Sequence, residues 1–266
     1  MHQRKLETLT RLGFAARGVM YVLIGLLALR SGRTEDGAGA LEYLSSGGGK
    51  LLLGLMALGF VAYGLWRLAD AFLDSEGHGS DGKGMAMRVG AAASGLLHLA
   101  LAYSAARLAS GNGGQGSGGG TQEGAATALN LPGGQLVLGI AALALLAVGA
   151  YQLVKAAQGS FLKHIDGRAA SEAWVRISGR LGYAARGIIF LIMGYFFGRA
   201  ALDESAGEAG GMGEALASLP PNLQLAVAFG LLLFGLFSFV EARYRRIKDP
   251  SEMAHRAAAS SADFFR

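Results

Sequence analysis

An eight-residue motif occurs three times in the 266-residue chain, each time at the start of a long apolar segment. Residues 11–18 read RLGFAARG, residues 180–187 read RLGYAARG, and residues 88–95 form a more divergent copy, RVGAAASG. A repeat with a long period constrains the fold strongly, because similar segments form similar structural units. The sequence therefore predicts three copies of one unit.

A second motif recurs at the end of each unit. Residues 64–71 read GLWRLADA, residues 149–156 read GAYQLVKA and residues 235–242 read GLFSFVEA, at spacings of 85 and 86 residues. Each unit thus contains two apolar segments, which return the chain to the side where it began, so the copies are parallel. We place the units at 1–75, 80–160 and 170–245, followed by a tail at 246–266.

The apolar segments predict six helices, near 12–30, 50–71, 87–108, 134–157, 178–199 and 222–243. Each is about 18–24 residues long, enough to cross a hydrocarbon core of ~30 Å. Only 16% of the residues are charged, whereas soluble proteins carry about a quarter. The expected fold class is an all-α membrane protein with six transmembrane helices, arranged as three tandem two-helix repeats with pseudo-threefold symmetry.

Basic residues predict the orientation of these helices. With the N-terminus inside, 19 of the 24 Lys and Arg residues lie at the inner side, and five lie outside: Arg30, Arg33, Lys50, Arg107 and Arg199. Positive residues are enriched on the cytoplasmic side of membrane proteins. We therefore expect a multi-pass protein of the plasma membrane with both termini, including the tail, in the cytoplasm.

The triplicated motif, each copy followed by a second helix, resembles a bacterial family of integral membrane proteins of unknown function, domain of unknown function 1206. That family is built from three tandem copies of a two-helix unit. The resemblance covers nearly the whole chain, although Ser94 replaces the second arginine of the motif in the middle copy. It implies the architecture and brings no reaction, ligand or catalytic residue.

Two motif arginines lie at an unusual depth. Twelve residues separate Arg17 from Arg30, and the same number separates Arg186 from Arg199. This is ~18 Å of helix, so at least one arginine of each pair lies within the apolar core of the membrane. Such a side chain either extends to the lipid phosphates or pairs with an acid on a neighbouring helix.

The second helices provide the acids for ion pairs. Units one and three have Asp70 and Glu241 at equivalent positions, whereas the middle unit has Lys155 there and Ser94 in place of the arginine. Arginine and acid are therefore present together or absent together. This predicts two ion pairs within units, Arg17 with Asp70 and Arg186 with Glu241, because an unpaired charge in an apolar medium is costly.

Other polar residues recur on the same helix faces and form a candidate polar cluster. Among them, His98 is interpreted either as a hydrogen-bonded packing residue or as a proton-relay or ligand residue. The cluster comprises Arg67, Ser94, His98, Gln152, Lys155 and Ser238. The basic segment after the last helix is either a topology anchor or a contact for anionic lipid headgroups; its residues are Arg243, Arg245, Arg246 and Lys248.

The sequence gives no sign of catalysis. It has no cysteine, which excludes disulfides, thiolate metal sites and cysteine nucleophiles. No catalytic set, metal-ligand spacing or cofactor motif lies in the helices, and the basic residues do not form the surface that nucleic acid requires. We expect a non-catalytic structural or accessory protein that contacts membrane lipids or an unknown protein partner; the alternative is a small channel or transporter along the pseudo-threefold axis.

Overall fold

The computed structural model describes residues 2–32, 34–74, 77, 79–112 and 120–246. Six long helices each contain a segment long and apolar enough to cross a membrane, which confirms the predicted number. They are α1 (His2–Ser31), α3 (Lys50–Leu73), α4 (Gly82–Ala109), α6 (Gly134–Gln158), α8 (Ala173–Leu202) and α10 (Pro221–Tyr244). The first helices of units two and three begin about five residues earlier than predicted.

Short helices connect the two long helices of each unit, and the sequence analysis did not predict them. They are α2 (Gly37–Ser46), α5 (Gly120–Leu129) and α9 (Met212–Ala217), the last preceded by η2 (Ala206–Glu208). Helix α2 shows why they form: the Asp36 side chain caps the backbone N–H of Gly39 at 2.9 Å, and Ala40 and Leu41 are buried. Capping and burial outweigh the low helix propensity of the glycines. Two further short elements, η1 (Ser160–His164) and α7 (Gly167–Ser171), connect α6 to α8.

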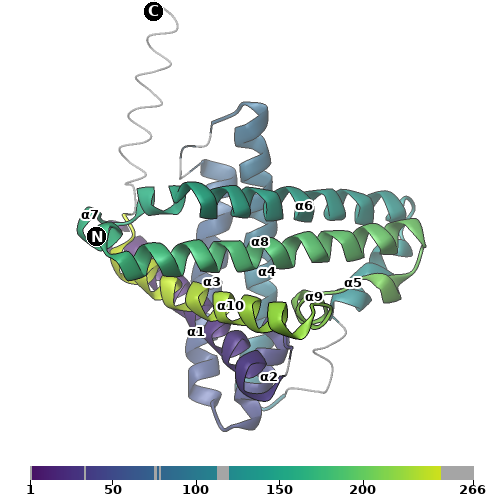
Figure 1. Ribbon diagram of the computed structural model, residues 1–266, viewed down its shortest axis with the longest axis horizontal. Coiled ribbons are helices and arrows are strands. Elements are labelled where there is room, and N and C mark those ends of the chain that lie inside the picture. Colours follow the sequence, from purple (N-terminus) through teal and green to yellow (C-terminus); the bar gives the residue numbers. More distant parts are fainter. Residues whose placement is uncertain (1, 33, 75–76, 78, 113–119, 247–266) are drawn as a thin grey trace, which may run out of the picture.

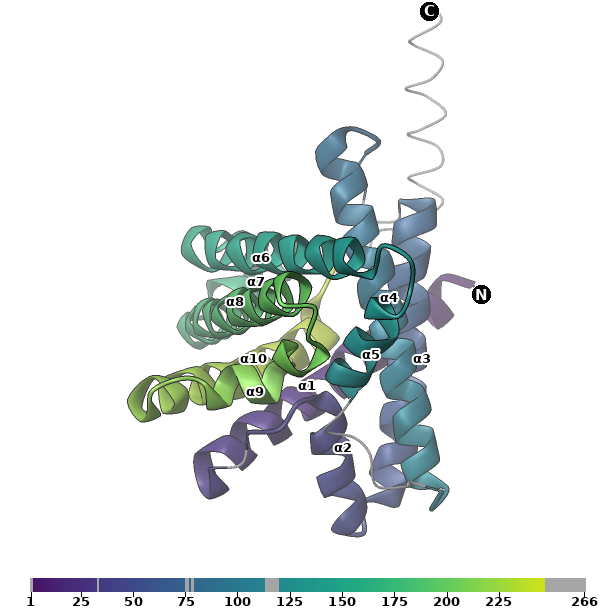
Figure 2. The same cartoon turned by 90° about the vertical axis from the view of Figure 1, so that its right-hand side faces the viewer.

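The long helices pack in the order α6, α8, α10, α1, α3 and α4. In Figure 1, α6 and α8 lie side by side and α3 and α4 run across their direction, while Figure 2 shows α6, α8, α10 and α1 stacked on one side of the α3–α4 pair. The most extensive contacts join the second helix of one unit to the first helix of the next. They pair α3 with α4, α6 with α8, and finally α10 with α1, so each unit contacts both of the others.

Glycine pairs mark the three crossings between units. A Cβ atom on the glycine of the second helix would lie only 2.8–3.0 Å from the backbone oxygen of the glycine on the first helix. Any side chain at these positions would push the helices apart, and small residues are the usual means of close helix contact in membranes. The pairs are Gly64 with Gly95, Gly149 with Gly187, and Gly235 with Gly18. Since these positions are equivalent in the three repeats, the crossings show the pseudo-threefold relation between units.

The middle unit departs from this symmetry. In units one and three, the two long helices of the unit also touch: a Cβ on Gly13 would lie 2.5 Å from the Cβ of Tyr63, and a Cβ on Gly182 would lie 2.7 Å from the Cα of Phe234. The equivalent glycine of α4, Gly90, has no atom within 4 Å of such a Cβ. Val148 stands where the other units have an aromatic ring, and it is 38% exposed. Helices α4 and α6 therefore lack the contact that closes the other two units.

The glycine crossings predict a difference between two glycines of α6. Gly149→Leu should lower the free energy of unfolding by about 1–3 kcal/mol, because its side chain would strike the backbone of Gly187. Gly139→Leu is the matched control, since a Cβ there meets nothing within 4 Å. Unfolding of both variants in mixed detergent micelles measures the effect, and equal stability of the two would contradict the close crossing.

Candidate functional site

Arg17 of α1 lies where α1, α3 and α10 meet and is only 6% exposed. Its Nε donates to Ser238 Oγ at 3.2 Å, and its Nη1 donates to Tyr63 Oη at 3.0 Å. Its Nη2 forms an ion pair with Glu241 Oε2. All three nitrogens of the guanidinium are therefore bound by partners on two other helices, which satisfies the requirement that a buried charge be paired and hydrogen-bonded.

The Glu241 carboxylate is shared by two arginines. It is 1% exposed, and its second oxygen accepts a hydrogen bond from Arg245 Nη1 at 2.9 Å. Backbone pairing of residues 164–166 with residues 244–246 holds Arg245 in place, with hydrogen bonds of 2.9 Å and 2.8 Å. Arg17, Glu241 and Arg245 thus form a continuous buried charge network from the centre of the protein to the end of α10.

Aromatic rings surround this network. The Arg17 Cζ lies 4.7 Å from the ring centroid of Phe14, 5.0 Å from that of Phe234 and 5.5 Å from that of Tyr63. Arg245 also lies over Phe14, at 5.0 Å. Cation–π contacts gain strength away from water, so these rings add to the stabilisation provided by Glu241.

The predicted pairing within units is wrong. Arg17 contacts Glu241 of unit three, and Asp70 accepts a hydrogen bond from Arg67 of its own helix at 3.1 Å. The reason is geometric: the Gly18–Gly235 crossing brings α1 against α10. Glu241 of unit three therefore lies next to Arg17. The chemistry of the pair was predicted, but its topology was not.

Arg186 has no carboxylate partner among the described residues, which also corrects the predicted pair with Glu241. Its Cζ lies 4.5 Å from the ring centroid of Phe234, 5.1 Å from that of Phe190 and 5.3 Å from that of Tyr21. Its Nε is buried without a hydrogen-bond partner in the described part of the chain. The two equivalent motif arginines therefore differ: Arg17 is fully paired, and Arg186 is held by aromatic rings.

The candidate polar cluster divides into separate groups. Ser238 binds Arg17 and donates its own hydroxyl to the backbone oxygen of Phe234 at 2.9 Å. His98 Nδ1 bonds to the backbone oxygen of Ser94 at 2.7 Å. On α6, Lys155 Nζ lies 4.6 Å from the ring centroid of Tyr183. The fully buried Asp70 forms an ion pair with Arg67. The Gln152 side chain is 5% exposed.

The basic side chains at the end of α10 and directly after it differ in exposure. Arg243 and Arg246 are exposed, as a lipid contact requires. Arg245 instead turns inward, with 9% of its side chain exposed, and binds Glu241, so the prediction of a lipid contact at this residue is wrong. The i, i+4 spacing of Glu241 and Arg245 is the sequence signal that would have shown the pair. Lys248 lies outside the described residues.

The first arginine of the motif has a role that the sequence analysis missed. Arg11 Nη1 donates to the backbone oxygen of Ala242 at 3.0 Å, and Arg88 donates to the backbone oxygens of Ala71 and Phe72 at 2.7 Å and 3.0 Å. Arg11 thus caps the C-terminal carbonyls of α10, and Arg88 caps those of α3. A positive charge at this end of a helix also interacts favourably with the helix dipole. Recurrence of this arginine at the start of each copy was the available signal.

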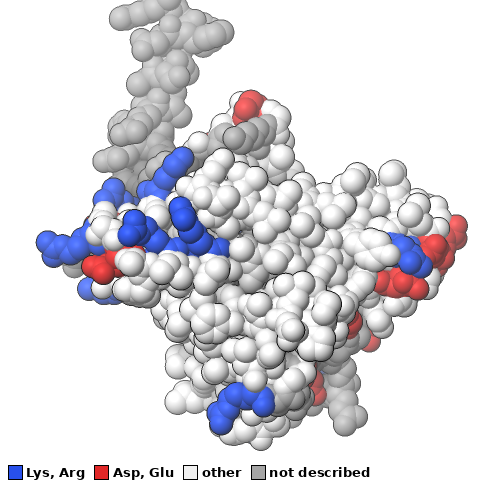
Figure 3. All heavy atoms as spheres, viewed as in Figure 1, with Lys and Arg blue, Asp and Glu red and all other residues white. Residues whose placement is uncertain are grey.

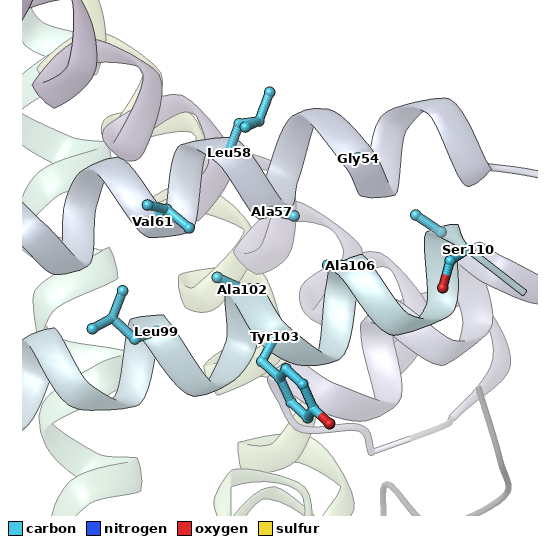
Figure 4. A pocket seen from close by; sticks show the side chains of 10 residues that line it. Gly54, Ala57, Leu58, Val61, Leu99, Ala102, Tyr103, Ala106 and Ser110 are labelled. Atoms are coloured by element: carbon cyan, nitrogen blue, oxygen red, sulfur yellow. The ribbon is translucent and has the colours of Figure 1, made fainter. Parts of the chain in front are cut away.

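A shallow hollow lies on the outer face of the α3–α4 pair (Figure 4). Its lining is apolar except for Tyr103 and Ser110, and it includes Gly54, Ala57 and Ala102. Such a lining provides contact for apolar groups and no acid–base or nucleophilic pair. In the described part of the chain, no three His, Asp or Glu side chains lie together as a metal ion would require.

Comparison with known proteins identifies the family. Three segments, 12–74, 89–159 and 181–245, match the family model described as Domain of Unknown Function (DUF1206). The chain belongs to the DUF1206 family. Each matched segment covers the two long helices of one unit, so the three DUF1206 repeats correspond to the three units of the fold.

A relative has the same extent as this DUF1206 chain. The uncharacterized protein YxxB of Bacillus subtilis (strain 168) is 32% identical over 251 residues, which span 89% of this chain and 90% of the relative. No solved structure matches. Neither the family description nor the name of the relative states a reaction.

The hydroxyl that binds Arg17 predicts the effect of a conservative change. Tyr63→Phe keeps the ring and removes an acceptor from a buried guanidinium, so the free energy of unfolding should fall by roughly 1.5–3 kcal/mol. Tyr103→Phe is the control, because Tyr103 is 66% exposed. If the two variants unfold at the same denaturant concentration, the Arg17–Tyr63 hydrogen bond contributes nothing.

Proposed function

We propose that this DUF1206 protein is a non-catalytic, multi-pass protein of the plasma membrane, with both termini in the cytoplasm, that binds anionic lipid headgroups at its inner face. The observation that carries the proposal is a cationic surface formed by η1, α7, the start of α8 and the end of α10. Its six exposed basic residues are Lys163, Arg168, Arg176, Arg180, Arg243 and Arg246.

The distribution of charge supports this orientation. In Figure 3, Lys and Arg gather at the end of the molecule where α7 lies in Figure 1, whereas acidic and basic side chains mix at the far end of α6 and α8. At that far end, Arg199 is paired with Asp203 at 2.8 Å. A cluster of positive charge such as the one beside α7 is what the anionic cytoplasmic leaflet attracts.

The cationic surface is held in a fixed arrangement. The backbone of Arg246 donates to His164 at 2.8 Å, and the backbone of Asp166 donates to Tyr244 at 2.9 Å. The end of α10 is thereby joined to the segment between α6 and α8. A surface that is already ordered loses less conformational entropy when it binds, which favours headgroup binding over a loose electrostatic contact.

The interior supports a structural role over the alternative of a channel. Aromatic side chains link the helices through the centre: Tyr21 lies 4.9 Å and Tyr183 lies 5.2 Å from Phe234 between ring centroids. Tyr183 also stacks on Phe161 at 5.2 Å, and Phe161 and Phe234 are fully buried. A channel needs a continuous polar path, and these packed rings fill the contact between units one and three.

The test compares lipid preference in two triple variants. Arg168→Gln, Arg176→Gln and Arg246→Gln together remove three charges from the cationic surface, and Lys50→Gln, Arg107→Gln and Arg199→Gln remove three from the opposite side. The full chain is reconstituted in nanodiscs of phosphatidylcholine with and without phosphatidylglycerol, and the bound phosphatidylglycerol is measured by mass spectrometry.

The first triple variant should lose most of its phosphatidylglycerol enrichment, since each basic residue near the headgroups contributes about 1 kcal/mol. The control variant should keep the enrichment of the parent protein. Equal loss in both variants, or no enrichment in the parent, would contradict the proposal.

A further inference from the structure

The three crossings between units share one backbone geometry but carry different polar residues. At the α10–α1 crossing, Arg17 meets Ser238 and Glu241. The α6–α8 crossing has the same glycine contact, Gly149 with Gly187. There the equivalent first-helix residue is Arg186, and the residues equivalent to Ser238 and Glu241 are Gln152 and Lys155. This crossing therefore has a lysine at the position where the other provides a carboxylate.

Different residues stand at the positions of all three partners of Arg17. Phe234 replaces Tyr63, Gln152 replaces Ser238, and Lys155 replaces Glu241. In agreement with this, Arg186 Nε, a hydrogen-bond donor, is buried without a partner in the described residues, and the Gln152 side chain is only 5% exposed. Buried polar atoms are rarely left unpaired, and such atoms indicate an unseen partner or a functional role.

Positive charges collect around one set of aromatic rings. Arg17 and Arg186 both lie over Phe234, at 5.0 Å and 4.5 Å from its centroid, so their Cζ atoms are no more than 9.5 Å apart. Lys155 lies over Tyr183, whose ring is 5.2 Å from that of Phe234. Glu241 neutralises one of these cations and is shared with Arg245. Arg186 and Lys155 are only partly exposed, and excess positive charge in such an apolar setting is costly unless an anion compensates it.

We propose that Arg186 and Lys155, with the amide nitrogen of Gln152 as a further donor, form a binding site for a phosphate group at the α6–α8 crossing. An arginine fork and a lysine ammonium are the side chains that bind phosphate oxygens most often. The phosphate takes the electrostatic place that Glu241 occupies at the α10–α1 crossing. It comes either from a lipid headgroup or from free phosphate. The site is separate from the exposed cationic surface and does not depend on it.

The test measures the thermal unfolding of the full chain in two arms. In the first arm, inorganic phosphate is titrated into protein in a neutral detergent, at constant ionic strength. In the second arm, the protein is in phosphatidylcholine nanodiscs with or without phosphatidylglycerol. In at least one arm the midpoint of the parent protein should rise by several degrees and saturate, because a ligand that binds only the folded state stabilises it by mass action. A response in the first arm indicates free phosphate, and a response in the second alone indicates a lipid headgroup.

Three variants assign the response to this site. Arg186→Gln should weaken the apparent affinity at least tenfold, whereas Arg199→Gln, on the same helix but exposed and paired with Asp203, should leave it unchanged. Lys155→Glu supplies the missing carboxylate from the protein itself, as Glu241 does for Arg17. It should raise the midpoint without ligand and abolish the response, and it remains informative if Arg186→Gln does not fold.

Two results would overturn the proposal. One is a parent protein whose midpoint responds to neither probe. The other is a response that Lys155→Glu or Arg186→Gln leaves at its full size, because the anion would then bind elsewhere, for example at the exposed cationic surface.

Discussion

A guanidinium buried in an apolar interior needs an anionic partner, and in this protein the partner of Arg17 comes from the far end of the chain. Glu241 lies 224 residues away in sequence, on the last helix of the last unit. The pair therefore joins the first long helix to the last one. Because removal of one member of a buried pair typically costs about 3–5 kcal/mol, this contact ties the two ends of the repeat array together. Each unit therefore contacts both other units, although the row of long helices stays open between α4 and α6.

Several positions of the eight-residue motif have a distinct structural role. Arg11 caps the carbonyl end of α10, Gly13 allows α3 to approach, Arg17 enters the charge network, and Gly18 forms the crossing with Gly235. Four of the eight positions in the first copy therefore make a contact with a neighbouring helix. The middle copy keeps the cap and the crossing glycine but has Ser94 in place of the arginine. Its two long helices are also the two that do not pack on each other.

The repeat period predicted the six helices and the three units, because apolar length and self-similarity are properties of the chain alone. The partners of the charged residues could not be predicted in the same way. The repeat pattern is the same whether the second helix packs on the first helix of its own unit or on that of the next unit. From the sequence, Asp70 and Glu241 were therefore equally good partners for Arg17. The choice depends on which glycines meet, and this is a three-dimensional fact. The short helix α2 was not predicted because its glycines have low helix propensity and the capping by Asp36 was overlooked. The pair of Arg245 with Glu241 was not predicted because Arg245 was read as one of several basic residues of the tail.

The most direct test of this account is a double-mutant cycle on the ion pair that joins the first unit to the last. Arg17→Met, Glu241→Gln and the double variant are unfolded by denaturing detergent in mixed micelles, with the exposed pair Arg199–Asp203 as the control cycle. The account predicts that the double variant is more stable than the sum of the single effects implies, by well over 1 kcal/mol, whereas the exposed pair should show a coupling of about 0.3–0.5 kcal/mol. Additive effects at Arg17 and Glu241 would contradict the claim that their ion pair stabilises the contact between the first and the last unit.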